Sequence, residues 1–144
     1  MWIFWTSEEP LFFVLFNLYL ANKANLGAPA EYDLQFVEGF ADRGLIVEHT
    51  PVSKYCRDLF GRVHIKMSMQ SDPFENTITA DAPVVAIIPE GFRPRQTVIA
   101  AAYGWSNNTA RGIATIVVRT NGEITAYGVS PYACAQGQIT YLAK

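Results

Sequence analysis

The sequence has few of the residues on which catalysis, metal binding and disulfide bonding depend. Its 144 residues include two cysteines, Cys56 and Cys134, and two histidines, His49 and His64. The cysteines stand far apart and lack the paired spacing of a zinc site. We expect two free thiols, Cys56 in a strand and Cys134 in a loop, with a single disulfide as the open alternative.

Charged residues are also scarce. They make up 17% of the chain, against 50% hydrophobic residues, and the formal net charge is −2. This apolar fraction excludes a disordered chain, and the lack of a basic excess speaks against a nucleic-acid partner. The length suits one ordinary domain with a short extension.

No apolar run is long enough to span a membrane. The longest extends from Leu11 to Ala21 and is interrupted by Asn17, whereas a bilayer requires about 20 residues. Glu8 and Glu9 precede this run, where a secretion signal would carry positive charge. We therefore predict neither membrane insertion nor a signal peptide.

Residues 1–30 are predicted to form a helix and a linker, separate from the domain that follows. Thr6 or Ser7 is a suitable helix N-cap, Pro10 suits the first turn, and a linker follows around residues 25–29. The apolar side chains of this helix need a cover. Either they form a short seam with other copies of the chain, or the helix packs onto the following domain.

Recognisable catalytic motifs are missing. The glycines form no phosphate-binding loop. Glu8 and Glu9 belong to a helix start, and Asp72 and Glu75 to a turn, where carboxylates are common. His64 alternates with basic residues on a strand face, and spacing assigns it no nucleophile or carboxylate. We predict a protein that is not an enzyme, with no catalytic residue, metal site or cofactor.

Residues 31–144 have the pattern of a β domain. Short strands separated by turn residues predict an all-β fold, an antiparallel β-sandwich or jelly roll. Asn121-Gly122 is the strongest hairpin signal and is typical of a type I′ turn. The expected strands span residues 32–38, 45–52, 54–58, 62–70, 76–80, 83–88, 96–103, 112–119, 123–129 and 138–143.

The apolar positions of these strands predict the core. The run from Val98 to Ala102 is apolar on both faces, so we expect one face in the core and the other against a second subunit. This run therefore favours an oligomer. The expected core consists of Val63, Ile65, Met67, Val84, Ala86, Ile88, Val98, Ala100, Ile113, Ile116, Val118, Ile124, Ile139 and Tyr141.

The segment from Tyr55 to Met67 predicts a β-hairpin. Leu59-Phe60-Gly61 forms its turn, and the return strand alternates apolar with polar and basic side chains. Arg62, His64, Lys66 and Ser68 are expected on its solvent face.

A second segment, Ile87 to Pro94, reads as a strand that a proline and a glycine terminate. Two arginines, Arg93 and Arg95, flank its end. One interpretation is that these arginines bind an anion or a sugar. The structural alternative is stacking over Phe92 or pairing with Glu90.

Aromatic and amide side chains mark a candidate binding surface. The stretch from Tyr103 to Thr109 is expected to leave an apolar strand as a polar loop, and the loop from Ser130 to Gly137 provides a second wall. Aromatic faces stack on sugar C–H groups, while amides and hydroxyls bind sugar hydroxyls. The alternative is that the aromatics cover a subunit boundary. The candidate residues are Tyr103, Trp105, Asn107, Asn108, Tyr127 and Tyr132.

Four motifs in order resemble the C-terminal receptor-binding head domain of bacteriophage tail-fibre and baseplate proteins. They read KYCRDLFGRVHIKM, IPEGFRP, ARGIATIVVRTNGEITAYG and QITYLAK, and together they cover roughly residues 47–144. No single motif is diagnostic, and the order of the four carries the resemblance.

The resemblance implies a homotrimeric head at the distal tail or baseplate of a virion. It implies attachment to a bacterial cell-surface saccharide, with other tail or baseplate proteins as further partners. Several weak sugar sites engaged together would give strong attachment. Two alternatives stay open: a purely structural tail or baseplate component, and a tail enzyme that degrades glycan.

Overall fold

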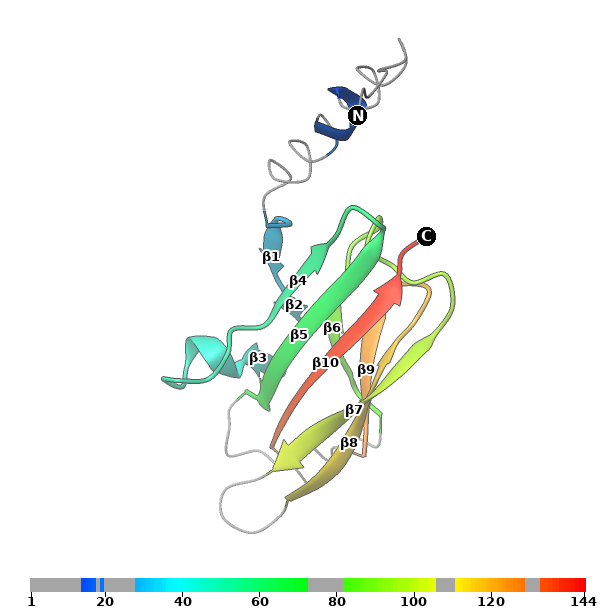
Figure 1. Ribbon diagram of the computed structural model, residues 1–144. Helices are drawn as coiled ribbons and strands as arrows, with labels where there is room; N and C mark the ends of the chain where they lie inside the picture. The colour runs from blue at the N-terminus through cyan, green and yellow to red at the C-terminus, as the bar shows by residue number, and fades with distance from the viewer. Residues whose placement is uncertain (1–13, 18, 20–27, 73–81, 106–110, 129–132) are drawn as a thin grey trace, which may run out of the picture.

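The computed structural model describes residues 14–17, 19, 28–72, 82–105, 111–128 and 133–144 (Figure 1). Most of the regular secondary structure in this part of the chain is β-strand. The elements are β1 (Glu31–Asp33), β2 (Gln35–Phe36), β3 (Phe40–Asp42), the 3-10 helix η1 (Arg43–Leu45), β4 (Lys54–Arg57), β5 (Arg62–Ser71), β6 (Val84–Ile87), β7 (Val98–Trp105), β8 (Arg111–Val118), β9 (Glu123–Tyr127) and β10 (Cys134–Leu142).

All ten strands belong to one antiparallel sheet that curls almost into a barrel (Figure 1). Its path is β1-β4-β5-β10-β7-β8-β9-β6-β2, and β3 pairs with β5 beside β4. The two ends of this path, β1 and β2, are separated in the chain by Leu34 alone. Leu34 is buried, and its N–H donates to the Ser53 carbonyl at 3.1 Å. One residue therefore joins the two edges, which divides the expected strand 32–38 in two.

The interior of this curled sheet is a single apolar cluster, which confirms most of the predicted core. On β5, Val63, Ile65, Met67 and Met69 all point inward and are buried. Because a strand alternates its faces, Arg62, His64 and Lys66 point outward. Ser68 shares their face but is buried, because its N–H donates to the Ser53 hydroxyl at 2.8 Å.

Two parts of the predicted core differ in the structure. Ile113 was expected inside but is 79% exposed, because it lies on the outer face of β8. Val84 is only half-buried, because the register of β6 against β9 shifts between Val84 and Ala86. This irregularity buries Val85 beside Ala86. Val98 and Ala100 are partly buried against the core.

Both predicted hairpins form, and both use a three-residue loop ending in glycine. In the first, Gly61 has a φ of 78° and its N–H donates to the Asp58 carbonyl at 3.0 Å. In the second, Gly122 has a φ of 94° and its N–H donates to the Arg119 carbonyl at 2.9 Å. A type I′ turn would also require a positive φ at Asn121, which the structure does not have. The type I′ prediction is therefore wrong, and the loop is the glycine-bulge type.

The expected strand 45–52 is wrong as well. Asp42 accepts hydrogen bonds from the Gly44 N–H at 2.9 Å, the Ser53 N–H at 2.8 Å and the Ser53 hydroxyl at 3.0 Å. The same carboxylate thus caps η1 and binds Ser53, at the far end of the segment between β3 and β4. Between these points the chain forms η1 and turns, with His49 at a φ of 64°. Residues 43–52 therefore form a loop that leaves the sheet and returns to it.

Two further predictions concern the cysteines and the strand 76–80. Cys134 begins β10 and is buried, so its expected place in a loop is wrong; both thiols are free, as expected. The expected strand 76–80 lies outside the described residues.

The N-terminal segment is helical where it is described. Residues 14–17 and 19 are helical, and the side chains of Val14, Leu15, Phe16 and Tyr19 are exposed. None of them belongs to the core cluster. Among the described residues, no helix has the length and apolar character needed to cross a membrane.

Candidate functional site

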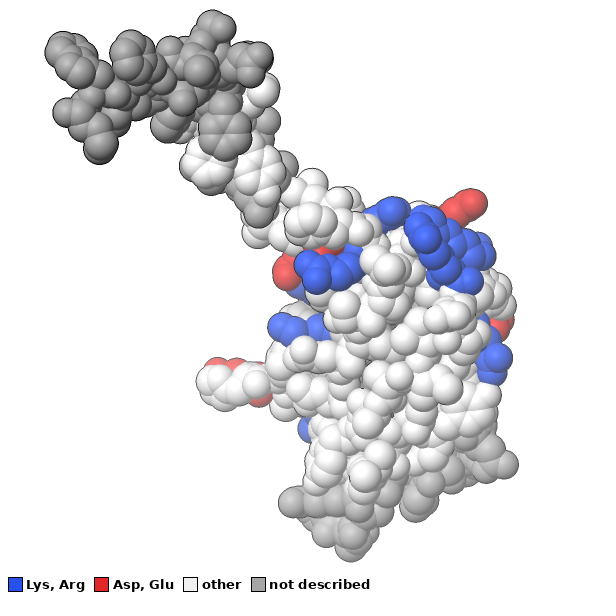
Figure 2. Space-filling view, turned by 45° about the vertical axis from the view of Figure 1, so that its right-hand side comes forward, with Lys and Arg blue, Asp and Glu red and all other residues white. Residues whose placement is uncertain are grey.

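The outer face of β7, β8 and β9 carries an exposed aromatic and aliphatic surface. Tyr103 and Trp105 alternate along β7 and therefore share this face, with ring centroids 5.7 Å apart and planes 27° apart in a stacked arrangement. Tyr103 lies opposite Ile113 in the ladder with β8. Figure 2 shows basic side chains gathered towards one end of the molecule and a broad, almost uncharged face below them.

Trp105 is in contact with a cation. The Arg43 guanidinium lies 5.4 Å from the centre of the Trp105 ring, a distance at which a cation is attracted to the ring face. The same guanidinium donates to the Gln70 amide oxygen at 3.1 Å and to Cys134 Sγ at 3.4 Å. Burial raises the pKa of the Cys134 thiol, and Arg43 only partly offsets this. Cys134 therefore has the character of a packing residue, not a nucleophile.

Tyr127 lies on the same outer face, on β9. Its hydroxyl accepts a hydrogen bond from the Arg119 guanidinium at 2.7 Å. It lies opposite Thr115, which in turn lies opposite Ala101. Tyr103 and Trp105 on β7 and Tyr127 on β9 thus share one face of the sheet, with β8 between them.

The predicted loop placement of these residues is only partly correct. Tyr103 and Trp105 lie in β7 and not in a loop, because the β7–β8 ladder continues to the pair Trp105 and Arg111. The other candidates, Asn107, Asn108 and Tyr132, lie outside the described residues. For the described part, the site is a strand surface of aromatic rings, which we call the aromatic platform (Tyr103, Trp105 and Tyr127).

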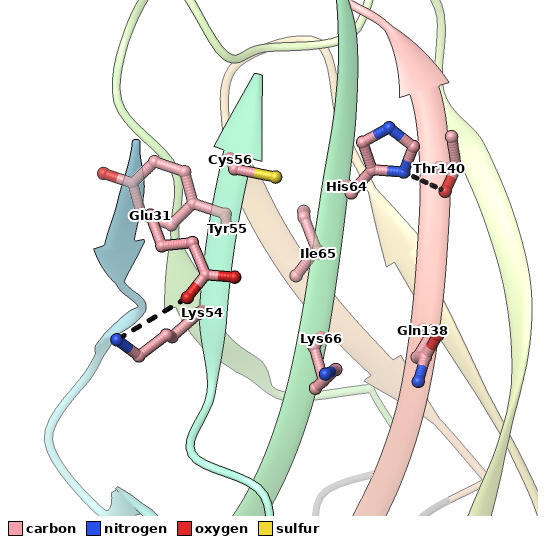
Figure 3. Close-up of a pocket in the computed structure, with 9 residues that line it drawn as sticks. All are labelled: Glu31, Lys54, Tyr55, Cys56, His64, Ile65, Lys66, Gln138 and Thr140. Atoms are coloured by element: carbon pink, nitrogen blue, oxygen red, sulfur yellow. Dashed lines mark hydrogen bonds and ion pairs between the residues drawn. The ribbon is translucent and has the colours of Figure 1, made fainter. Parts of the chain in front are cut away.

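A polar pocket of about 180 Å³ lies on the outer face of β4, β5 and β10 (Figure 3). Lys54 lies 3.8 Å from both Glu31 and Asp33. Burial, reinforced by Glu31 and Asp58, raises the pKa of the Cys56 thiol in this pocket. Its lining is Glu31, Lys54, Tyr55, Cys56, His64, Ile65, Lys66, Gln138 and Thr140.

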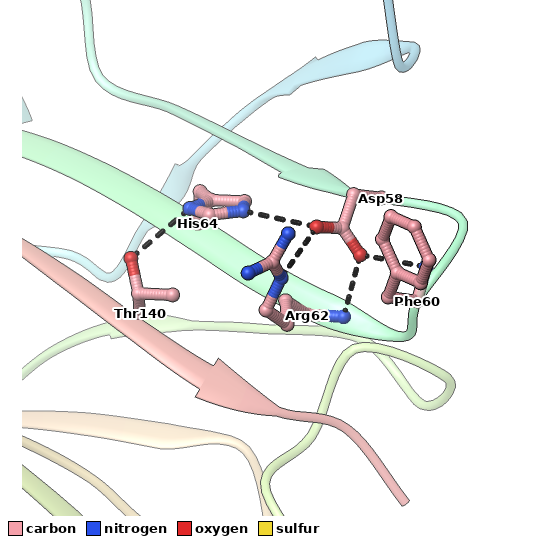
Figure 4. Close-up of polar contacts among 5 residues, drawn as sticks. All are labelled: Asp58, Phe60, Arg62, His64 and Thr140. Carbon is pink, nitrogen blue, oxygen red and sulfur yellow. Dashed lines mark hydrogen bonds and ion pairs between the residues drawn. The ribbon is translucent and has the colours of Figure 1, made fainter. Parts of the chain in front are cut away.

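Next to this pocket, Asp58 organises the hairpin tip (Figure 4). Its carboxylate accepts from the backbone N–H groups of Phe60 and Arg62, both at 2.9 Å, and from Arg62 Nε at 2.8 Å. Burial alone would raise the pKa of Asp58, but the hydrogen bonds from Arg62, Phe60 and His64 lower it to about 2. Asp58 therefore stays charged at neutral and mildly acidic pH and stabilises this turn.

Asp58, His64 and Thr140 form a series of carboxylate, imidazole and hydroxyl. His64 Nδ1 and Thr140 Oγ1 are 3.0 Å apart, and His64 Nε2 lies 3.5 Å from Asp58 Oδ2. Sequence spacing could not reveal this series of side chains, because Thr140 lies on a strand far along the chain from Asp58 and His64. The Asp58 carboxylate makes its short contacts to Arg62 and not to His64. The Asp58–His64–Thr140 series therefore suits a structural bridge between the hairpin and β10. His64 is confirmed as a hydrogen-bonded surface group.

Both arginines after the second motif bind backbone carbonyls, so the predicted stacking over Phe92 and pairing with Glu90 are wrong. Arg93 Nε donates to the Ile88 carbonyl at 3.4 Å, and Arg95 Nε donates to the Ala143 carbonyl at 2.9 Å. Phe92 instead packs edge-on against Tyr55, with centroids 4.9 Å apart.

No group of three or more histidine, cysteine or acidic side chains suitable for a metal ion occurs in the described part of the chain. The chemistry available on the described surface is therefore aromatic stacking, hydrogen bonding and ionic contact.

The fold is that of phage receptor-binding head domains. The head domain of the lactococcal phage bIL170 matches with a TM-score of 0.58 at 11% identity, over 81% of this chain and 100% of that one. The receptor-binding protein gp15 of Listeria phage PSA matches with a TM-score of 0.57 at 16% identity, over 98% of this chain and 82% of that one. No protein-family model and no curated protein matches the sequence. The expected all-β head-domain fold is thus confirmed.

Proposed function

We propose that this chain is a receptor-binding domain of a phage tail that attaches to saccharide on the host cell surface. The observation that carries the proposal is the exposed stack of Tyr103 on Trp105, on a fold shared with phage receptor-binding domains. A stacked pair in contact with a cation offers a rigid apolar face for a sugar ring. The Tyr127 hydroxyl and nearby amides supply hydrogen bonds to sugar hydroxyls.

The proposal includes a homotrimer at the distal tail or baseplate, contacting other tail proteins. Ile99 is 68% and Ile113 79% exposed on the outer face of β7 and β8. Isoleucines this exposed on neighbouring strands favour a covered surface in the assembly. The exposed helical residues of the segment 1–30 are a second surface for association.

Attachment of fluorescently labelled protein to host cells tests this function. Trp105→Ala should reduce attachment by at least about tenfold, because stacking of one ring contributes on the order of 1 kcal/mol per site and several sites act together. Phe60→Ala, which removes an exposed aromatic ring at the hairpin tip outside both proposed surfaces, is the matched control. Full attachment by Trp105→Ala would favour the alternative of a structural component that contacts protein.

A glycan-degrading tail enzyme is the second alternative, favoured by the Asp58–His64–Thr140 series. Incubation with cell-wall polysaccharide, followed by measurement of its chain length, decides this point. We expect unchanged length. Shortening that disappears in Thr140→Val would establish catalysis.

A further inference from the structure

Two depressions meet on the outer face of β10. The first is the polar pocket described above, and the second has a volume of about 490 Å³ and is lined by Arg95, Gln96, Val98, Thr140, Tyr141 and Leu142. Thr140 lines both, so the two depressions are neighbours on β10, and we treat them together as one groove. Pockets for small ligands measure about 300–1,000 Å³. The first depression is too small alone, but the joined groove suits an extended ligand.

The second depression exists because two strands separate. β10 pairs with β7 only from Cys134 opposite Trp105 to Gly137 opposite Ala102. Beyond that point β10 continues to Leu142 along β5, while the start of β7 pairs with β8 alone. Figure 1 shows the two strands diverging towards the end where the chain terminates. The groove is therefore built into the sheet and does not depend on a flexible loop.

Of the two lysines that line the first depression, only Lys54 has acidic partners among the described residues. Lys54 and Lys66 lie directly opposite each other across β4 and β5, and like charges in this position repel. Lys54 turns to Glu31 (Figure 3) and also lies 3.8 Å from Asp33. Lys66 is exposed, and in the described structure its ammonium pairs with no carboxylate. An anion placed beside Lys66 would relieve this repulsion.

The second depression has its own cation at the rim. Arg95 donates through Nε to the Ala143 carbonyl at 2.9 Å. This bond fixes the guanidinium in place, and no acidic residue lines the depression. Lys66 and Arg95 thus lie on opposite sides of Thr140, with Gln138, Gln96 and the Thr140 hydroxyl available for hydrogen bonds between them.

We infer that this groove binds an anionic glycan strand, with Lys66 and Arg95 each holding a negative group. Sugar carboxylates and sugar phosphates offer the same charged oxygens, and both suit a lysine and a fixed arginine. The inference rests on the proposed receptor-binding function and deepens it. It adds a second contact region, separate from the aromatic platform, and gives the charge of the receptor.

Calorimetric titration of the full chain with defined oligomers tests the inference. The probes are oligogalacturonate for carboxylate, oligo(glycerol phosphate) for phosphate, and maltooligosaccharide of matched length as the neutral probe. At least one anionic probe should bind, more weakly as salt rises. Lys66→Gln and Arg95→Gln should each weaken it about two- to fivefold, the scale of one exposed ion pair. Lys66→Arg should restore it.

Lys144→Gln is the matched control, since it removes one exposed charge outside the groove. Equal weakening in this control and in Lys66→Gln would overturn the inference, because the effect would then follow net charge. Failure of both anionic probes to bind would also overturn it. If the unmodified chain still attaches to host cells in that case, the receptor-binding proposal stands without the groove. The variants are exposed substitutions, and their thermal unfolding midpoints confirm folding.

Discussion

At the scale of single residues, side chains that look alike in the sequence have different roles in the structure. Arg62, His64 and Lys66 alternate on one strand face and look like one polar cluster in sequence. Arg62 and His64 contact Asp58 and stabilise the hairpin. Lys66 alone extends its charge into the polar pocket without a carboxylate partner among the described residues. The residue with the fewest contacts is therefore the strongest candidate for ligand binding.

Asp58 allows a prediction about pH. Its pKa is lowered to about 2 from the ordinary 3.8. The stability it contributes is therefore fully present above about pH 4 and is lost as pH falls towards 2. Asp58→Asn should lower the unfolding midpoint at neutral pH by a few degrees, because the charge-assisted bonds to Arg62 are lost. Calorimetry between pH 7 and 2 should show the wild type and variant converging at acid pH; parallel curves would contradict this.

At the scale of elements, turn and strand patterns proved predictable, but long-range polar contacts did not. The alternation on β5 correctly placed Val63 and Met67 inside. The sequence predicts a strand over residues 45–52, because they include strand-forming residues such as Ile46 and Val47, but they lie in the loop 43–52. The decisive contact joins Asp42 to Ser53, and spacing alone does not reveal such a pair.

The Asp42 clamp allows a direct test of that contact. Asp42→Ala leaves the Gly44 N–H, the Ser53 N–H and the Ser53 hydroxyl without their acceptor. We expect a loss of about 2–4 kcal/mol in the free energy of unfolding, because buried polar groups become unsatisfied. Urea unfolding measures it. Glu48→Ala, in the same loop but exposed, should change stability by less than about 0.5 kcal/mol; equal losses would refute the clamp.

Gly137 is the last residue of β10 that pairs with β7. A Cβ at this position would lie 2.9 Å from Ile116 Cδ1 and 3.0 Å from Ala102 Cβ. Gly137→Val should therefore destabilise the protein by about 1–3 kcal/mol through overpacking. Gln136→Val, on the opposite face of the same strand, is the control. A Gly137→Val variant as stable as the wild type in urea would contradict this packing.

The candidate site shows the same limit of sequence reasoning. Aromatic composition predicted Tyr103, Trp105 and Tyr127 as binding residues; they share one face, and their role in binding stays a prediction. The groove across β10 escaped prediction, because it depends on where β10 and β7 separate. Lys66 lies on β5, whereas Arg95 lies in the segment between β6 and β7. Only the order of strands in the sheet places both beside Thr140.

At the scale of the whole molecule, the exposed apolar surfaces call for association. Ile99 and Ile113 are both exposed on the outer face of β7 and β8. We expect light scattering of the full chain to give the mass of a trimer, three times 16.0 kDa. Ile113→Asp should shift the mass towards the monomer, because a buried unpaired charge opposes association. A monomeric wild type would contradict the proposed assembly.

The most direct test of the receptor-binding proposal is attachment to host cells before and after chemical removal of wall polysaccharide. We expect labelled protein to bind intact cells of a susceptible strain and to lose most of that binding after stripping. Trp105→Ala should bind weakly to both preparations. Attachment of the wild type that is unchanged by stripping would contradict saccharide recognition.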